Sequence, residues 1–434
     1  MRVAIESLAH GGDAIARLDD GRVAFVRGGC PGDVAEIEIV ADHGSRVEAR
    51  IASLVELSQD RVEPPCPYFG RCGGCQWQHV SEGAQRAART RNVSDALARI
   101  GKLDVAVEPI VSASGDYGYR NKVEFVVEEA GRELQLGLHR LNDQRLLPVL
   151  SCMLLPSAAR SAPRALTGAL RYLTGRHGSL GIQRVGIRVA CHTQDIEIAL
   201  WTTPGQFPRQ MAAKALADAI GATGVVRVLV KGPPNGRNVT GVEVLKGRGN
   251  WSERLGPNRM AISAPSFFQV NTLAAESLVA HVIEALEPTE HDRVLDLYSG
   301  AGTFTLPLAA CAGEVVAVEG SRYALADLRR NLEVARLDAD IVGGDVSREL
   351  PELGGFDLAV LDPPRSGLDP ATREALAATG ARRIAYVSCD PATLARDSAM
   401  LACAGYRVAR VTPHDLFPQT YHVESIVIFE REDL

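Results

Sequence analysis

The sequence predicts three parts: a small β-barrel over residues 1–58, an α+β part over residues 59–261, and a doubly wound α/β domain over residues 262–434. Three observations predict this fold class. Short β-rich segments are separated by glycine turns at the start, a Pro-Pro break precedes a cysteine cluster, and strands alternate strictly with helices at the end. A length of 434 residues suits two or three domains, and 46% hydrophobic residues suffice for packed cores.

The N-terminal part contains short strands separated by turns. Residues 23–26 and 34–40 are β-rich, and glycine pairs such as Gly28-Gly29 separate segments of this kind. Strands at this spacing indicate a barrel of the size of an oligonucleotide-binding fold.

The middle part begins after Pro64-Pro65 with a predicted helix at residues 81–100, for which Ser81 is a good N-cap. Beyond it the pattern supports only an α+β assignment. The predicted strands are 121–127, 134–138 and 196–201, and the predicted helices are 156–175 and 206–220.

The C-terminal part alternates strands with helices, which predicts a parallel sheet with ligands at the carboxyl ends of its strands. The predicted strands are 294–298, 315–319, 338–342, 357–361, 383–388, 407–411 and 424–430, with helices at 321–337, 370–379 and 391–405.

The compartment follows from the N-terminus and the cysteines. The first residues carry charges where a signal peptide needs an apolar stretch, and no run of about 18 uncharged apolar residues predicts a membrane span. We therefore expect a cytoplasmic protein, whose nine cysteines are ligands, nucleophiles or core residues rather than disulfides.

The net charge of −6 hides an uneven distribution. Lys and Arg minus Asp and Glu give −5 for residues 1–60, +2 for 61–110, +9 for 111–260 and −12 for 261–434. A basic centre between acidic ends is compatible with an RNA partner, and equally with a solvated surface on which charges cluster by chance.

A nucleoside site is indicated at the first strand of the C-terminal part. The strand runs into Ser299-Gly-Ala-Gly-Thr303, where Gly300 and Gly302 allow a tight turn close to a ligand. Glu319 ends the next strand, where its carboxylate can accept hydrogen bonds from ribose hydroxyls, and Asp345 follows the third strand. Because the third glycine of the dinucleotide motif is missing, this pattern favours S-adenosylmethionine over NAD or a purely structural turn.

A reaction site is indicated at the next two strand ends and at the last strand. Asp362 is followed by two prolines that stiffen its loop, and Cys389 lies between a strand end and a helix that begins at Pro391. We expect the helix dipole to favour the thiolate of Cys389. The default interpretations are a core cysteine and, for Glu424, a solvated glutamate at a strand end.

Cysteine and glutamate together suit methylation at carbon 5 of uracil. That carbon becomes nucleophilic once a thiolate adds to carbon 6, and a base must later remove the carbon-5 proton. We therefore expect Cys389 to be the nucleophile and Glu424 the base.

The C-terminal motifs resemble the RNA uracil-5 methyltransferase family, which has a class I methyltransferase (Rossmann-like) domain. The resemblance rests on Ser266-Phe-Phe-Gln-Val-Asn271, Val294-Leu-Asp-Leu-Tyr298, Asp362-Pro-Pro-Arg365, Tyr386-Val-Ser-Cys-Asp-Pro-Ala-Thr-Leu-Ala-Arg-Asp397 and Phe417-Pro-Gln-Thr-Tyr-His-Val-Glu424. It implies Cys389 as nucleophile, Glu424 as proton acceptor, and contacts to S-adenosylmethionine from Gln269, Tyr298, Glu319, Asp345 and Asp362, in addition to the contact expected at the Gly300 turn. Ser299 and Asp390 depart from a common cysteine and a common asparagine of these motifs, and neither change removes a reacting atom.

The N-terminal half extends the resemblance. Residues 1–58 resemble a TRAM domain, an RNA-binding barrel related to the oligonucleotide-binding fold, although an acidic barrel leaves its grip on RNA in question. Cysteines spaced Cys66-x5-Cys72-x2-Cys75, with the distant Cys152, are similar to the [4Fe–4S] site of the 23S ribosomal RNA branch. Four thiolates alone would suit zinc as well as iron and sulfur.

The sequence thus predicts an enzyme of rRNA processing that forms 5-methyluridine, most similar to the large-subunit uridine-1939 type. We expect 23S rRNA as partner, no membrane association and a monomer. Two alternatives stay open: an amino-group methyltransferase, because Asp-Pro-Pro resembles motifs that hold a target nitrogen, and an iron–sulfur RNA-binding protein with a silent methyltransferase fold.

Overall fold

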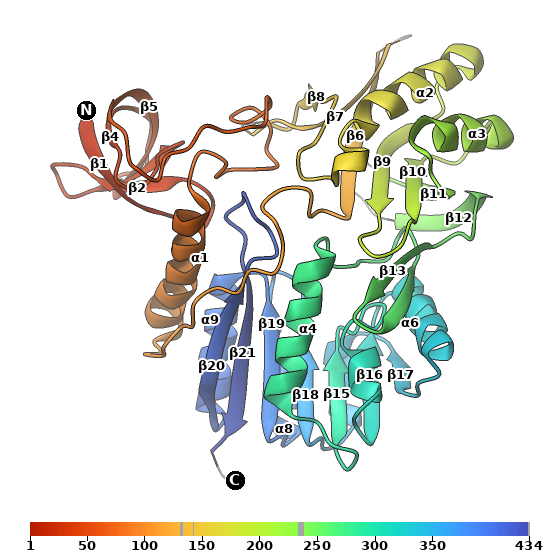
Figure 1. Cartoon of the computed structure of the whole chain (residues 1–434). Coiled ribbons are helices and arrows are strands. Elements are labelled where there is room, and N and C mark those ends of the chain that lie inside the picture. The colour runs from red at the N-terminus through yellow and green to blue at the C-terminus, as the bar shows by residue number, and fades with distance from the viewer. Residues whose placement is uncertain (131–132, 142, 233–237, 433–434) are drawn as a thin grey trace.

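A closed barrel and two seven-stranded sheets form the chain, with a two-stranded hairpin between the sheets (Figure 1). The computed structural model describes all residues except 131–132, 142, 233–237 and 433–434. No helix among the described residues has both the length and the apolar character needed to cross a membrane.

The predicted N-terminal barrel is present and closes in the order β1-β2-β3-β5-β4. Closure leaves no free strand edge, and alternate residues such as Val3 and Ile5 point into the core. The strands are β1 (Arg2–Leu8), β2 (Ala14–Arg17), β3 (Val23–Arg27), β4 (Val34–Asp42) and β5 (Arg46–Glu56).

Helix α1 (Glu82–Ala96) bridges the barrel and the C-terminal sheet, and a π-helical turn (Leu97–Gly101) follows it. Ser81 caps α1 as predicted, since its hydroxyl accepts a hydrogen bond from Ala84 N at 3.3 Å. Ala88 belongs to the core of the barrel, whereas Val93 and Leu97 belong to the core of the C-terminal sheet. The division at residues 58/59 and 261/262 stays a prediction.

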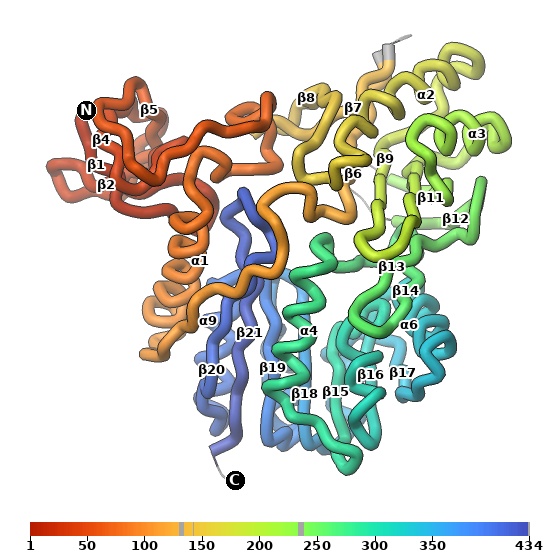
Figure 2. The backbone as a smooth tube through the Cα atoms, in the orientation of Figure 1, coloured from red at the N-terminus to blue at the C-terminus, as the bar shows by residue number. Residues whose placement is uncertain are grey.

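The segment after α1 crosses the C-terminal unit before it enters the central sheet (Figure 2). Along strand β20 (Tyr406–His414), Glu108 N donates to Val411 O and Val111 N donates to Pro413 O, both at 2.9 Å. This segment therefore joins the central and C-terminal parts along one edge.

The central sheet has the order β12-β11-β10-β9-β6-β7-β8. Helices α2 (Ala162–His177) and α3 (Arg209–Ile220) pack on one face, through core residues that include Leu170 and Leu216. A 3-10 turn (Ser157–Ala159) precedes α2, so the helix begins later than predicted. The strands are β6 (Lys122–Ala130), β7 (Glu133–His139), β8 (Leu146–Pro148), β9 (Ile182–Val189), β10 (Ile196–Thr202), β11 (Gly224–Lys231) and β12 (Asn238–Lys246), and the hairpin that follows is β13 (Trp251–Leu255) with β14 (Asn258–Ile262).

The C-terminal sheet has the order β17-β16-β15-β18-β19-β21-β20. The predicted parallel arrangement holds for the first five strands, but β21 runs antiparallel to both β19 and β20. The connection from His414 to Glu424 is too short for the crossover of a dozen or more residues that a parallel pair requires. The strands besides β20 are β15 (Arg293–Leu297), β16 (Glu314–Glu319), β17 (Asp340–Gly343), β18 (Leu358–Leu361), β19 (Arg383–Ser388) and β21 (Glu424–Arg431).

Helices cover both faces of this sheet, as a doubly wound fold requires. On one face Leu278 and Leu328 pack against the sheet, and on the other Leu376 and Leu394 do so. The helices are α4 (Thr272–Leu286), α5 (Thr305–Ala309), α6 (Arg322–Ala335), α7 (Val346–Glu349) with a 3-10 turn (Leu350–Glu352), α8 (Pro370–Ala378) and α9 (Pro391–Cys403).

Candidate active site

The carboxyl ends of five parallel strands bring the predicted residues to one edge of the C-terminal sheet. Strands β15 to β19 pair in parallel register, so these ends share that edge. The residues at the ends are Tyr298 after β15, Glu319 on β16, Asp345 after β17, Asp362 after β18 and Cys389 after β19.

Glu319 holds the glycine turn after β15. Gly300 N donates to Glu319 Oε2 at 2.9 Å, and Ser321 N donates to Oε1 at 2.6 Å. Gly300 has φ +58°, and a Cβ added there would meet only Tyr298 O, at 4.0 Å. That side of the turn is therefore open, which leaves room for a ligand beside a carboxylate.

Gly302 has a packing role instead. Its φ is +98°, and an added Cβ would clash with Leu306 and lie 2.8 Å from Leu328 Cδ1. The prediction that both glycines approach a ligand therefore fits the geometry of Gly300 but not that of Gly302. Tyr298 also has a positive φ, +61°, which is rare for a non-glycine residue and marks the turn as a constrained one.

Asp345 is exposed and caps helix α7. Its Oδ1 accepts hydrogen bonds from Ser347 N at 3.0 Å and Ser347 Oγ at 2.5 Å. These bonds lower the pKa of the carboxyl, which stays ionised at the rim of the strand ends.

Gln269 and Asp362 lie in contact, although 93 positions separate them in the chain. Gln269 Nε2 donates to Asp362 Oδ2 at 3.1 Å, and Asn121 of the central part donates through Nδ2 to Gln269 O at 2.8 Å. Burial raises the pKa of Asp362 to about 7. This contact joins two of the predicted residues, and the Asn121 bond ties them to the start of the central sheet.

Cys389 and Glu424 lie near each other because β21 runs beside β19, with Ser388 opposite Ser425 in the register. Glu424 is 2% exposed, and its Oε1 has no hydrogen-bond partner in the part of the chain that the structure describes. Burial, followed by the charge of Asp362, raises its pKa well above the ordinary value. Once ionised, a carboxylate whose pKa is raised binds a proton more strongly than an ordinary one, which suits a general base.

The thiol of Cys389 is not ionised by its surroundings. Burial and then the Glu424 carboxylate raise the pKa of Cys389 to about 12, while Arg365 opposes them. The sequence suggested a thiolate favoured by the helix dipole, but burial and the carboxylates outweigh such a contribution. Sequence reasoning assigned no role to Arg365, although it closes the Asp-Pro-Pro-Arg motif.

A buried carboxylate, Asp397 on α9, holds the loop that carries Asp362 and Arg365. Its Oδ2 accepts from Leu368 N at 2.9 Å and from the Tyr386 hydroxyl at 2.8 Å. Arg373 Nη1 and Arg396 Nε each donate to its Oδ1 at 2.9 Å. This residue was also missed as a site residue; its only sequence signal was its place in the motif around Cys389.

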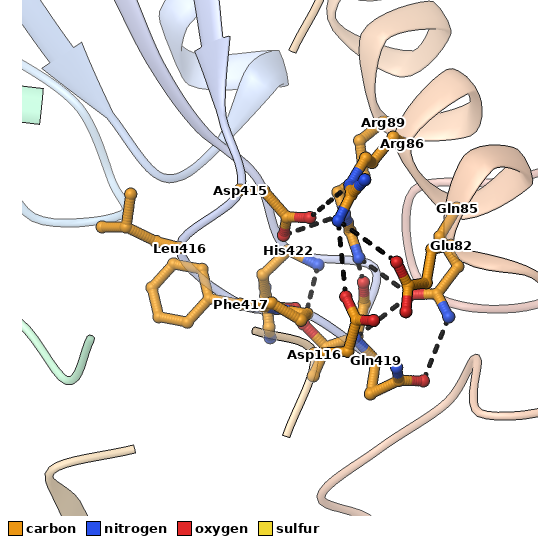
Figure 3. Close-up of polar contacts among 12 residues, drawn as sticks. Glu82, Gln85, Arg86, Arg89, Asp116, Asp415, Leu416, Phe417, Gln419 and His422 are labelled. Atoms are coloured by element: carbon orange, nitrogen blue, oxygen red, sulfur yellow. Dashed lines mark hydrogen bonds and ion pairs between the residues drawn. The ribbon is translucent and has the colours of Figure 1, made fainter. Parts of the chain in front are cut away.

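The loop before Glu424 is held by helix α1 (Figure 3). Arg89, which is fully buried, forms an ion pair with Asp415 at 3.0 Å and donates from Nε to Thr420 O at 3.1 Å. Gln85 Nε2 donates to Gln419 Oε1 at 3.0 Å. A helix from the N-terminal half therefore fixes the approach to the proposed base.

The four predicted metal ligands line one cavity of about 340 Å³, which lies between the cysteine loop and the central sheet. They are Cys66, Cys72, Cys75 and Cys152, and all are free thiols. Burial raises the pKa values of the last three, that of Cys75 to about 12. As the described residues lie, no three His, Cys, Asp or Glu side chains are grouped closely enough to hold a metal ion.

Comparison with known proteins defines the class. The tRNA (Uracil-5-)-methyltransferase family matches residues 258–432, and the TRAM domain matches residues 1–52. The structure of a Pyrococcus abyssi tRNA (uracil-54, C5)-methyltransferase in complex with S-adenosyl-L-homocysteine has the same fold, with a TM-score of 0.77. The two chains are 24% identical, and the aligned region covers 99% of this chain and 100% of the Pyrococcus abyssi chain.

Full-length relatives are more similar in sequence. An uncharacterized RNA methyltransferase of Gloeobacter violaceus is 36% identical over 99% of this chain and 96% of its own length. The 23S rRNA (uracil(1939)-C(5))-methyltransferase RlmD of Thiobacillus denitrificans is 34% identical over 99% of each chain. The chain belongs to the RNA uracil-5 methyltransferase family and carries its TRAM barrel.

Proposed function

We propose that the protein transfers a methyl group from S-adenosylmethionine to carbon 5 of a uridine in 23S rRNA, forming 5-methyluridine. The family supports the reaction, and the full-length similarity to the 23S rRNA enzyme supports the substrate. The observation that carries the proposal is the placement of Cys389, Glu424 and Arg365 at one strand edge, where Glu424 raises the pKa of Cys389 and Arg365 acts to lower the pKa of both.

In the first step the Cys389 sulfur forms a bond to carbon 6 of the uracil. The thiol must first give its proton to solvent, because Glu424 has to remain free to take the carbon-5 proton later; in the free protein the raised pKa of Cys389 holds the thiol protonated. Arg365, which lowers the pKa of Cys389, would stabilise the thiolate. Addition moves the electron pair of the C5–C6 double bond toward carbon 5 and the O4 enolate.

In the second step carbon 5 attacks the methyl carbon of the sulfonium, and S-adenosylhomocysteine leaves. Glu424 then takes the proton from carbon 5, the C6–S bond breaks, and the double bond and the thiolate are restored. The raised pKa of Glu424 matches this role, because a carboxylate of ordinary pKa is a weaker base.

We assign the binding of S-adenosylmethionine to Gln269, Tyr298, Gly300, Glu319, Asp345 and Asp362. The open side of Gly300 beside Glu319 supports a nucleoside there. The contact between Gln269 and Asp362 supports a second anchoring point at the next strand end along the sheet.

We propose a [4Fe–4S] cluster for Cys66, Cys72, Cys75 and Cys152, with zinc as the alternative. The convergence of four free thiols on one cavity supports a metal group that binds all four as thiolates. The thiols must move closer to bind it. Its role would be to hold the cysteine loop against the central sheet, and the reaction above needs no electron from it.

Iron and acid-labile sulfide in protein purified without oxygen would support the cluster, and stoichiometric zinc would support the alternative. We further propose that the protein is a monomer in the cytoplasm. The cytoplasm is a reducing compartment, which suits a protein whose nine cysteines are all free.

The decisive experiment uses RNA with 5-fluorouridine at the target position. Fluorine cannot leave as a proton does, so the adduct persists, and we expect a bond between Cys389 and carbon 6. Cys389→Ala should abolish the trap and the release of tritium from 5-tritiated uridine. Cys403→Ala, at the exposed C-terminal end of helix α9, which begins two residues after Cys389, is the matched control. An active Cys389→Ala variant would exclude this mechanism and would favour methylation of an amino group.

A further inference from the structure

One tract of the central part is unusual in charge. Residues 144–194 contain no Asp, no Glu and no Lys, but they contain seven arginines. These are Arg145, Arg160, Arg164, Arg171, Arg176, Arg184 and Arg188. Arginine presents a planar fork of donors that matches phosphate oxygens, so a run of arginines without acids suggests a polyanionic partner.

Helix α2 displays part of this tract on its exposed face. Arg164, Gly168, Arg171 and Gly175 lie at positions i, i+4, i+7 and i+11, which places them on one stripe, and all four are exposed. Arg176 follows, with its guanidinium 4.9 Å from the ring of Tyr172. The helix contains no Asp or Glu.

On the neighbouring helix α3, by contrast, the cationic side chains form ion pairs with acidic ones. Arg209 donates to Glu243 at 2.7 Å, and Lys214 pairs with Asp218 at 2.9 Å. Within the described residues, Arg164 and Arg176 of α2 form no such ion pair. The charges on α3 are thus neutralised locally. On α2 the guanidinium groups of Arg164 and Arg176 are available to a partner, whereas Arg171 donates from Nε to Leu134 O at 2.8 Å and offers only its remaining N–H groups.

Several residues of α2 are unfavourable for the stability of the helix itself. Arg164 lies in the first turn, where the helix dipole disfavours a cation. A Cβ added at Gly168 or Gly175 would meet no atom of the described residues within 4 Å, so no packing contact in that part of the chain requires glycine there. Glycine in the interior of a helix makes it less stable than alanine would. Small residues between arginines do allow a bulky partner to approach the helix closely.

The face also lies away from the candidate active site. Helices α2 and α3 cover one face of the central sheet, whereas Trp201 and Val228 on its other face pack with Ala264 of the C-terminal part. Figure 1 shows α2 at an outer corner of the molecule, distant from the carboxyl ends of β15 to β19.

We propose that the exposed face of α2, defined by Arg164, Gly168, Arg171, Gly175 and Arg176, binds the phosphate backbone of an RNA segment remote from the target uridine. This inference rests on the proposed function for the identity of the RNA. The acidic C-terminal part, with net charge −12 over residues 261–434, repels RNA at long range, and a remote basic face offsets that repulsion. The recognised substrate is then a folded RNA that extends beyond the segment that carries the target uridine.

The test compares two double variants of equal charge change. Arg164→Gln with Arg176→Gln removes two cations from the α2 face, and Arg209→Gln with Lys214→Gln removes two paired cations from α3. Binding is measured against salt concentration for three probes. They are a 23S rRNA fragment that contains the target uridine and its neighbouring segments, a short synthetic hairpin that carries the target uridine in its loop, and an unrelated RNA duplex. Thermal unfolding checks that both variants fold.

For the fragment and the duplex, we expect the slope of log affinity against log salt to fall by about 0.9 for each lost contact, and affinity near 0.1 M salt to fall on the order of tenfold. Hairpin binding and methylation should stay as in the wild type. An unchanged slope, or an equal loss in the α3 variant, would overturn the proposal; the unchanged slope would point to an acidic protein surface instead. If the wild type methylates neither target RNA, the proposed function fails, while the slope for the unrelated duplex still decides this inference.

Discussion

His10 of the barrel lies 3.8 Å from Asp390, the residue after Cys389, measured from Nε2 to Oδ2. The other oxygen of Asp390 accepts from Ala392 N at 3.0 Å and Thr393 N at 2.9 Å, and so caps helix α9. The contact with His10, together with this cap, lowers the pKa of Asp390 to about 2. The barrel therefore contacts the N-cap residue of α9, which directly follows the proposed nucleophile. This contact is additional to the RNA binding that the TRAM family implies for the barrel.

The first prediction concerns this contact. His10→Ala should lower kcat severalfold and change KM little, because a partly exposed pair contributes about 1 kcal/mol or less. Asp390→Asn keeps an oxygen for the cap but removes the charge, so His10→Ala should cost nothing further in that background. His43→Ala is the control, since His43 pairs with Glu48 on the barrel surface. An equal loss in both backgrounds would show that His10 acts through another residue.

The second prediction concerns the buried ion pair of Arg89 with Asp415. Two arginines pair with the Asp415 carboxylate, which is 2% exposed: the fully buried Arg89 at 3.0 Å and the partly exposed Arg86 at 3.5 Å. Arg89→Gln removes the buried partner and leaves only the weaker one, so we expect a loss of up to about 3 kcal/mol in the free energy of unfolding. Arg86→Gln, one turn earlier on a side chain that is 32% exposed, should cost less than about 1 kcal/mol. Urea denaturation measures both. Similar losses in the free energy of unfolding for the two variants would mean that Arg89 stabilises the loop no more than Arg86 does.

The third prediction concerns the pH dependence of Cys389. Its raised pKa means that the thiolate fraction, and hence alkylation by iodoacetamide without RNA, increases as pH rises toward about 12. Glu424→Gln removes a charge that raises this pKa, so the rate curve should move to lower pH. Arg365→Gln removes a charge that lowers it, so the curve should move to higher pH. Mass spectrometry of modified Cys389 gives the rates, with exposed Cys403 as the reference in the same molecule. Slower alkylation in Glu424→Gln would contradict the electrostatic account.

Much of the C-terminal fold could be predicted because its strands are buried apolar runs. Residues 383–388 were predicted as a strand and form β19, and Glu319, Asp362 and Cys389 were placed by the rule that ligands meet strand ends. Strand β9 of the central sheet was missed, because its apolar pattern is interrupted by Arg184 and Arg188. Inside the sheet Arg188 lies 3.7 Å from Glu197, a pairing that no local pattern reveals.

The contacts around the site could be predicted less well. His10 meets Asp390 and Arg89 meets Asp415 only after the barrel and α1 have docked on the C-terminal unit, across hundreds of residues of sequence. Neither contact has a periodic signal. Gln269 was placed by family resemblance alone, since its contact with Asp362 depends on how the segment before α4 crosses the strand ends.

The last prediction separates the two glycines of the turn after β15. Gly302→Ala should lower the free energy of unfolding by about 2 kcal/mol or more, because its Cβ meets Leu306 and Leu328 at a positive φ. Gly300→Ala should cost only about 1 kcal/mol, since φ +58° lies in the left-handed region and the space is open. If S-adenosylmethionine occupies that space, however, Gly300→Ala should weaken its binding at least tenfold by calorimetry. Wild-type affinity in Gly300→Ala would place the cofactor on another side of the turn. An unchanged unfolding midpoint in Gly302→Ala would show that the side chains of Leu306 and Leu328 can move aside.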